Sequence, residues 1–213
     1  GEHDAFFQPS ITDEEASLYE HCARGLDQSL ATGEHGLPLI GTGDWNDGMN
    51  RVGELGHGES IWLGWFLHAT LGAFVPLAQA RGDLLHAARW QAHATALQAA
   101  LEQHGWDGDW YRRGYFDDGT PLGSAASEEC RIDSIAQSWG VISGAAGHER
   151  ATRAMAAVES QLIQPDKGLA LLFTPPFDRT VREPRYIKGY PPGIHENGGQ
   201  YTHAATWSVL AFA

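Results

Sequence analysis

The stretch Gly41-Thr-Gly-Asp-Trp-Asn-Asp-Gly-Met-Asn50 lies between two segments of helical pattern and combines two acids, a tryptophan and two amides. Its glycines indicate a tight polar turn. An indole ring can stack on the apolar face of a pyranose, and carboxylates and amides bind sugar hydroxyls. A carboxyl group beside an indole is poorly solvated when charged, so its pKa can rise as a general acid requires. The turn therefore fits a sugar site, and equally a polar turn whose tryptophan belongs to the core.

Composition limits the classes of function. The chain has 213 residues, 42% of them hydrophobic, which is enough for one globular domain with a substantial core. Its net charge of −13 argues against nucleic acid or an anionic membrane surface as a partner. Cys22 and Cys130 are too few for a disulfide scaffold. No run approaches the roughly 20 apolar residues of a membrane-spanning helix and no signal peptide is visible, so we expect a cytoplasmic location.

Helical patterns dominate the chain. Thr12-Asp-Glu-Glu15 has the form of a capping box, and a helical stripe of Leu18, Cys22, Leu26 and Leu30 follows it as far as Gly33. Five further helices are expected over residues 59–81, 84–104, 133–146, 148–163 and 202–212.

The remaining segments break this pattern. Pro76 predicts a kink or a break in the helix over 59–81. Aromatic residues over 110–115 predict a short hairpin. Residues 164–199 form a long segment rich in proline and glycine, which is usually functional in a compact domain.

The expected fold is therefore all-α, with long polar loops and at most a short β-hairpin. Two architectures fit: an orthogonal helical bundle, or an α/α toroid of inner and outer helices. The segment 59–81 is apolar nearly all round at its start, which predicts an inner, buried helix. In a toroid, the loops at one rim would converge on a single pocket.

Four blocks resemble one known family, in the same order. They are Gly43-Asp-Trp-Asn-Asp-Gly-Met-Asn-Arg-Val-Gly53, Gly58-Glu-Ser-Ile-Trp-Leu63, Ile132-Asp-Ser-Ile-Ala-Gln-Ser-Trp139 and Lys188-Gly-Tyr-Pro-Pro-Gly-Ile-His-Glu-Asn-Gly-Gly-Gln-Tyr-Thr-His203. Together they resemble glycoside hydrolase family 94, the inverting β-glucoside phosphorylases. Residues 35–44 and 188–207 are most similar to the C-terminal, phosphorylase-like region of cyclic β-1,2-glucan synthases.

The resemblance implies a fold and a reaction. Residues 1–213 would form part of an (α/α)6 catalytic barrel (a toroid) within a longer chain. The reaction would be inverting phosphorolysis of β-glucosides, either β-1,2-glucan or cellobiose-like compounds, to α-glucose 1-phosphate. No cofactor or metal is expected, and inorganic phosphate is the co-substrate. Phosphate is already an anionic nucleophile, so such an enzyme needs the acid of an inverting pair but no base.

The first block supplies the expected acid. By position in the motif, Asp47 matches the family's general acid and Trp45 matches a residue lining the sugar site. Asp44 is either a ligand of a substrate hydroxyl or an acid that caps the turn.

The last block supplies the other candidate residues. Glu196 and Tyr190 match residues of the family's substrate pocket, with loop packing as the alternative for Tyr190. His203 matches a phosphate ligand, because an imidazole can donate to phosphate, or it is an exposed residue at a helix start. His195 stands where cellobiose phosphorylases tend to have lysine, which suggests an acceptor linked differently from cellobiose.

Other parts of the family pattern lie outside this sequence, among them a Thr-Gly phosphate loop and an arginine and aspartate that grip the donor sugar. We therefore expect the remainder of a larger chain to be the partner of these 213 residues, and no turnover without it. A homo-oligomer is also compatible with the resemblance. A synthase-like parent would place this segment on the cytoplasmic side of the inner membrane, without direct membrane contact.

Two other functions fit the same residues. One is an inverting hydrolase with Asp47 as acid and Glu196 as base. The other is a non-catalytic helical module that binds carbohydrate. The spacing of histidines predicts no metal site, and the glycines do not match a dinucleotide-binding motif.

Overall fold

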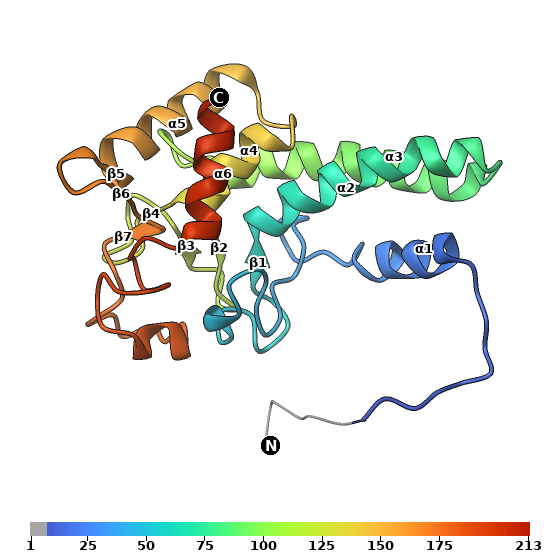
Figure 1. Ribbon diagram of the computed structural model, residues 1–213, viewed down its shortest axis with the longest axis horizontal. Helices are drawn as coiled ribbons and strands as arrows, with labels where there is room; N and C mark the ends of the chain where they lie inside the picture. Colours follow the sequence, from blue (N-terminus) through green and yellow to red (C-terminus); the bar gives the residue numbers. More distant parts are fainter. Residues whose placement is uncertain (1–7) are drawn as a thin grey trace.

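Helices dominate the computed structural model, which describes residues 8–213 (Figure 1). The helices are α1 (Leu18–Gln28), α2 (Ile61–Ala80), α3 (Leu84–Ala100), α4 (Ser134–Ile142), α5 (His148–Leu162) and α6 (Thr202–Phe212). Four short helical turns accompany them: η1 (Asp47–Met49), η2 (Leu101–Gly105), η3 (Pro165–Lys167) and η4 (Tyr186–Gly189). The predicted helical character of the fold is confirmed, and helix α4 ends earlier than expected.

The structure contains more β-structure than the single hairpin expected. Within residues 8–213, seven two-residue strands form three antiparallel sheets. The strands are β1 (Glu59–Ser60), β2 (Gly114–Tyr115) and β3 (Pro121–Leu122) in the order β1-β2-β3, β4 (Ile132–Asp133) paired with β7 (Phe173–Thr174), and β5 (Ile163–Gln164) paired with β6 (Leu169–Ala170).

The expected hairpin over 110–115 is displaced along the chain to residues 114–122. A Cβ at Gly114 would lie 2.3 Å from the carbonyl oxygen of Glu59, so only glycine lets strand β1 approach strand β2 this closely. The pairing of β2 with β1, which is distant in sequence, therefore sets the position of the hairpin. The aromatic pattern of residues 110–115 gives no information on that pairing.

The predicted cap of helix α1 was wrong. Ser17, not Thr12, is the N-cap: its Oγ accepts from the Glu20 backbone N–H at 3.3 Å, and Glu20 Oε2 accepts from the Ser17 N–H at 2.7 Å. The capping box therefore begins five residues later than expected, and Leu18 is 79% exposed. The helix ends at Gln28, well before Gly33.

Helices α2 and α3 lie side by side over most of their lengths (Figure 1). Trp65 on α2 and Trp90 on α3 are fully buried in the same core cluster. Of the kink or break expected at Pro76, the break is absent, because α2 continues to Ala80. Pro76 lies on an exposed face, where water can satisfy the carbonyl that loses its helical partner.

Helix α2 also revises the expectation about membrane spans. Its 20 residues have a mean hydropathy of 1.5 over their best window, which is long and apolar enough to cross a membrane. Its apolar character has a local explanation, because Trp65 and Leu71 are fully buried in the core that α2 shares with α3.

Several loops meet at one end of the molecule, below α4 and α6 in Figure 1. The segment around η1 contacts η4, and the Arg51 N–H donates to the Pro184 carbonyl at 3.3 Å. Asp117, in the β2–β3 turn, donates its N–H to the Val52 carbonyl at 2.9 Å. Three regions far apart in the sequence thus form one rim, and this rim carries the residues expected to act on substrate.

Candidate functional site

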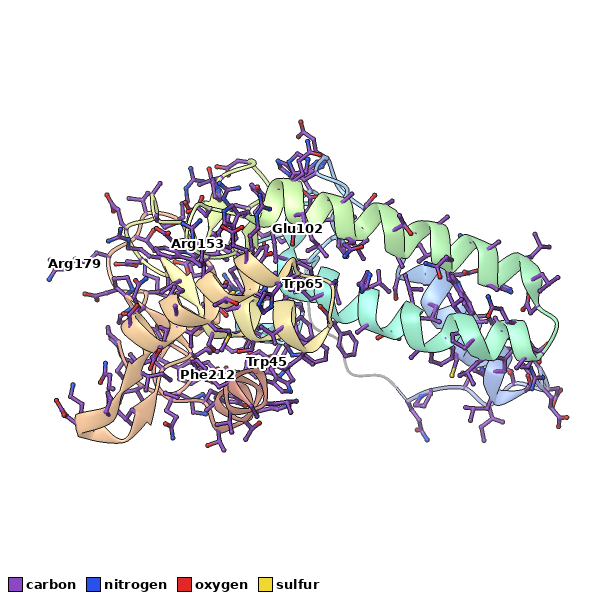
Figure 2. The ribbon with its side chains drawn as sticks, turned by 90° about the horizontal axis from the view of Figure 1, so that it is seen from above. Trp45, Trp65, Glu102, Arg153, Arg179 and Phe212 are labelled. Atoms are coloured by element: carbon purple, nitrogen blue, oxygen red, sulfur yellow. The ribbon has the colours of Figure 1, made fainter. Side chains whose placement is uncertain are left out.

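The first and last blocks of the sequence meet through Trp45 and His203. The Trp45 Nε1–H donates to His203 Nδ1 at 3.1 Å. The Trp45 ring also packs against Trp207 and Tyr201, each with a centroid distance of 5.4 Å. Figure 2 shows Trp45 beside helix α6, on which His203 and Trp207 lie. The two predicted residues therefore belong to one cluster.

Asp47 and Glu196 form a pair of acids at this rim. Asp47 begins turn η1 with an exposed side chain, whereas Glu196 is only 7% exposed in the loop before α6. Burial raises the pKa of Glu196, and the negative charge of Asp47 raises this pKa further. The two carboxyl groups are close enough to interact, and only Asp47 opens freely to solvent.

Aromatic side chains flank this pair of acids. Tyr190 stacks on His195 with ring centroids 4.7 Å apart, and Tyr186 lies edge-on to Tyr190 at 6.4 Å. Burial, followed by interaction with the Asp47 carboxylate, raises the pKa of the Tyr186 phenol. The left-handed backbone of His195, with φ of 54°, turns the chain sharply just before Glu196.

Asp44 lies on the opposite side of the same turn. Both of its carboxylate oxygens accept from Arg113, at 2.6 Å and 2.7 Å, and Ser60 Oγ donates to Oδ2 at 2.6 Å. Neither the Asp44 nor the Arg113 side chain has exposed surface. Burial alone would raise the pKa of Asp44, but the Arg113 guanidinium holds it below its ordinary value.

This geometry corrects the prediction that Asp44 binds a substrate hydroxyl. Its carboxylate is fully occupied by protein donors, and Asp44 Oδ1 also accepts from the Asn46 backbone N–H at 3.0 Å. The alternative of a turn-capping acid fits instead. Asp44 thus shapes the turn from within rather than contacting a ligand.

Arg113 has a second acidic neighbour. Its Nε lies 3.4 Å from Asp133 Oδ2, and Asp133 Oδ1 caps helix α4 by accepting from the Ile135 N–H at 2.9 Å. Burial raises the pKa of Asp133 to about 6, and Arg113 opposes this rise. One buried guanidinium therefore serves two buried carboxyl groups.

The family model for the glycosyl hydrolase 94 superfamily, catalytic domain, matches residues 1–213. The chain belongs to this superfamily. It is 62% identical to the cyclic beta-(1,2)-glucan synthase NdvB of Rhizobium meliloti, over all of this chain and 8% of that protein. The predicted family is thereby confirmed, as is the similarity to a cyclic glucan synthase.

Phosphorylases of the same superfamily are more distant relatives. The chain is 37% identical to the 3-O-beta-D-glucopyranosyl-beta-D-glucuronide phosphorylase of Paenibacillus borealis, over 92% of the chain and 25% of that enzyme. It is 32% identical to the cellobionic acid phosphorylase of Neurospora crassa, over 94% of the chain and 25% of that enzyme. The chain spans about a quarter or less of the length of these three relatives.

Within this glycosyl hydrolase 94 domain, five of the six predicted site residues share the loop rim: Trp45, Asp47, Tyr190, Glu196 and His203. The sixth, Asp44, faces the interior. No group of three His, Cys, Asp or Glu side chains suited to a metal ion occurs among the residues that the structure describes.

Sequence reasoning missed Asn197, which holds the Glu196 loop. The Asn197 side chain is fully buried and donates to the carbonyls of Phe177 and Tyr190, both at 2.8 Å. It also accepts from the Phe177 N–H at 2.8 Å. The position of Asn197 directly after the candidate acid Glu196, within the block 188–203, could have indicated this role.

Arg113 and Tyr186 were also missed. Arg113 could have been recognised as a charged residue within the aromatic segment 110–115. Tyr186 could have been recognised as an aromatic residue four positions before Tyr190. Gln137, which had no predicted role, is buried and bonds to both the N–H and the carbonyl of Tyr111, at 2.8 Å and 2.7 Å. Gln137 therefore holds the aromatic segment that presents Arg113.

Proposed function

We propose that the domain containing this chain catalyses the phosphorolysis of β-glucosides with inversion, and that β-1,2-glucan is its substrate class. The observation that carries the proposal is that two segments distant in sequence meet: Trp45 Nε1–H donates to His203 Nδ1, and the negative charge of Asp47 raises the pKa of Glu196. This arrangement combines an exposed acid, an aromatic face and an imidazole, which are the groups that glucoside phosphorolysis requires.

In this mechanism Asp47 is the general acid. Its proton passes to the glycosidic oxygen as the bond from that oxygen to C1 breaks. A phosphate oxygen attacks C1 from the opposite face, and the single displacement inverts the β-glucoside to α-glucose 1-phosphate. No base is needed, because the nucleophile is already an anion.

His203 is the proposed phosphate ligand. Its Nδ1 accepts a hydrogen bond from Trp45 Nε1, so the neutral ring carries its proton on Nε2. That Nε2–H is the donor left for phosphate. Trp45 thus sets the tautomer of the histidine, and its ring provides a face for the sugar.

Glu196, Tyr190 and His195 are proposed to bind the sugar on the acceptor side. Glu196 is 7% exposed beside Asp47, and its carboxyl oxygens can accept hydrogen bonds from sugar hydroxyls. Similarity to the NdvB synthase of Rhizobium meliloti, closer than to the phosphorylases reported above, is the reason to prefer a β-1,2-glucan over cellobiose.

The proposal concerns a longer protein, since the chain spans only about a quarter or less of the length of the relatives reported above. The helices and the converging loops are compatible with a segment of an (α/α)6 barrel whose other segments supply donor-sugar and further phosphate contacts. A cytoplasmic location, where phosphate is abundant and glucose 1-phosphate can be used, is part of the same proposal.

The test uses the full-length natural protein. It is incubated with β-1,2-linked gluco-oligosaccharides or with cellobiose, with and without phosphate, and glucose 1-phosphate is assayed. Phosphate-dependent product from the β-1,2 substrates supports the proposal, and reaction of cellobiose alone overturns the substrate class. Free glucose formed at full rate without phosphate would instead support an inverting hydrolase with Asp47 as acid and Glu196 as base.

A further inference from the structure

Asp47 needs external support to act as a general acid. It begins a turn of only three residues, and its side chain is exposed. A carboxyl group that donates a proton has to lie within about 3 Å of the leaving oxygen. A misplacement of about 1 Å can cost roughly 100-fold in rate. Whatever holds the turn therefore influences the chemical step.

A continuous series of hydrogen bonds leads from the turn to Arg113. Asn46 Oδ1 accepts from the Gly48 backbone N–H at 3.1 Å, and Asp44 Oδ1 accepts from the Asn46 N–H at 3.0 Å. The Arg113 guanidinium then donates to both oxygens of Asp44, at 2.6 Å and 2.7 Å. Two parallel bonds fix the relative orientation of two planar groups. The residues on either side of Asp47 are thus held by hydrogen bonds that lead to the Arg113 guanidinium.

Backbone packing couples Asp44 directly to Asp47. Gly43 has a φ of 130°, and a Cβ at Gly43 would lie 2.9 Å from the Cα of Asp47. The turn is closed on itself, with the backbone just before Asp44 against the backbone of Asp47. A shift of Asp44 is therefore transmitted to Asp47 rather than absorbed between them.

Arg113 is itself anchored to the beginnings of two core helices. Its Nη1 donates at 3.2 Å to Ser60, the N-cap of α2, and its Nε faces Asp133, the N-cap of α4. Its backbone N–H donates to Leu122 at 2.8 Å, and its carbonyl accepts from Ile61 at 3.1 Å. Rigid elements thus hold the guanidinium from several sides.

We propose that Arg113 is a positioning residue for the reaction: through Asp44 it orients the Asp47 carboxyl toward the glycosidic oxygen. The Arg113 side chain has no exposed surface, so it acts through the turn and not by contact with a ligand. The inference rests on the proposed function, since it takes Asp47 to be the general acid. It adds a residue, outside the recognised sequence blocks, that controls proton transfer.

The test compares two leaving groups in the full-length natural protein. A gluco-oligosaccharide leaves as an alcohol and needs a proton from Asp47, whereas β-glucosyl fluoride releases fluoride without one. In both cases phosphate forms the new bond to C1. A mispositioned acid slows the first reaction far more than the second, whereas general damage to the fold slows both alike.

Two variants change the support in different ways. Arg113→Lys keeps the positive charge but loses the bidentate contact with Asp44. Asp44→Asn keeps the shape of the side chain but loses its negative charge. For each, kcat on the oligosaccharide should fall about 100-fold with KM nearly unchanged, while kcat on β-glucosyl fluoride should fall less than about 5-fold. Arg112→Lys is the matched control, because Arg112 bonds to Asp107 and Tyr115 and not to the turn.

The outcomes separate this inference from the proposed function. Equal losses on both substrates in the variants, or full activity on both, would overturn the role of Arg113. If Arg113→Lys does not fold, Asp44→Asn decides by the same comparison. A wild-type protein that releases no glucose 1-phosphate from either substrate would overturn the proposed function, and this inference with it.

Discussion

Asp44 and Asp47 lie three residues apart in one turn, yet they occupy opposite environments. Asp44 points inward, has no exposed surface and is held by Arg113, which keeps its pKa low. Asp47 points outward to the loop rim, beside Tyr186 and Glu196. Their residue types are identical, so chemistry alone does not separate them. The difference teaches that a buried carboxylate saturated by protein donors holds a site, while a carboxyl group exposed at the rim can meet a substrate. Each of the following measurements tests or refines that contrast.

Substitution at the outward acid should have the largest effect. Asp47→Asn in the full-length protein should lower kcat on gluco-oligosaccharides by about 10²–10⁴-fold, because the amide cannot donate the proton. Binding of the oligosaccharide, followed by calorimetry, should be retained. The exposed Asp166→Asn is the control. Unchanged turnover would rule out Asp47 as the acid.

Substitution on the inward side should act on stability. Arg113→Met removes a buried charge and leaves Asp44 and Asp133 without their partner, so the free energy of unfolding should fall by about 3–5 kcal/mol. Urea denaturation of the wild type and the variant measures this. Arg153→Met, which breaks the exposed pair with Asp109, should change stability little. Similar losses at the two arginines would contradict a special role for the inward pair.

The phosphate ligand should show a narrower effect. His203→Ala removes one hydrogen bond to a charged ligand, worth about 1.5–3 kcal/mol, so the KM for phosphate should rise roughly 10–100-fold. The KM for the glucan should change much less. Initial rates at varied phosphate and fixed glucan give the comparison, with the exposed His148→Ala as control. Equal changes in both constants would make His203 a structural residue.

The smallest and most specific expected effect is the contribution of Asp133 to the pH dependence of stability. Because burial raises the pKa of Asp133 to about 6, the folded protein keeps a proton that the unfolded chain loses above about pH 4. The resulting stability is fully present below about pH 4 and is lost as the pH rises through about 6. Relative to Asp133→Asn, the wild type should therefore lose up to about 1.4 kcal/mol per pH unit between these values.

Urea denaturation at pH 4, 5, 6 and 7 measures this slope. An asparagine at position 133 can still cap helix α4, so the cap itself adds no pH dependence. A difference between the wild type and the variant that is constant from pH 4 to pH 7 would show that Asp133 keeps its charge throughout.

The elements predicted from periodicity are those whose pattern is local. Helix α3 begins at Leu84 as expected, because Asp83 caps it by accepting from the His86 N–H at 3.2 Å. The cap of α1 was misplaced, because two capping-box patterns follow one another, at Thr12–Glu15 and at Ser17–Glu20, and the helix uses the second. Pro76 did not break α2, because the burial of large side chains such as Trp65 and Leu71 outweighs the roughly 3 kcal/mol that an interior proline costs. Local signals place elements, and contacts with distant residues correct their ends.

The sequence by itself determined the helical class, the superfamily and the short list of polar residues at the site, because these depend on residue type and spacing along the chain. Only the tertiary structure decided which of two acids faces inward. Asp44 is buried because Arg113, just before strand β2, and Ser60, the N-cap of α2, reach it from distant parts of the sequence. The side of the turn that meets these partners is a property of packing, and no spacing within residues 41–50 encodes it.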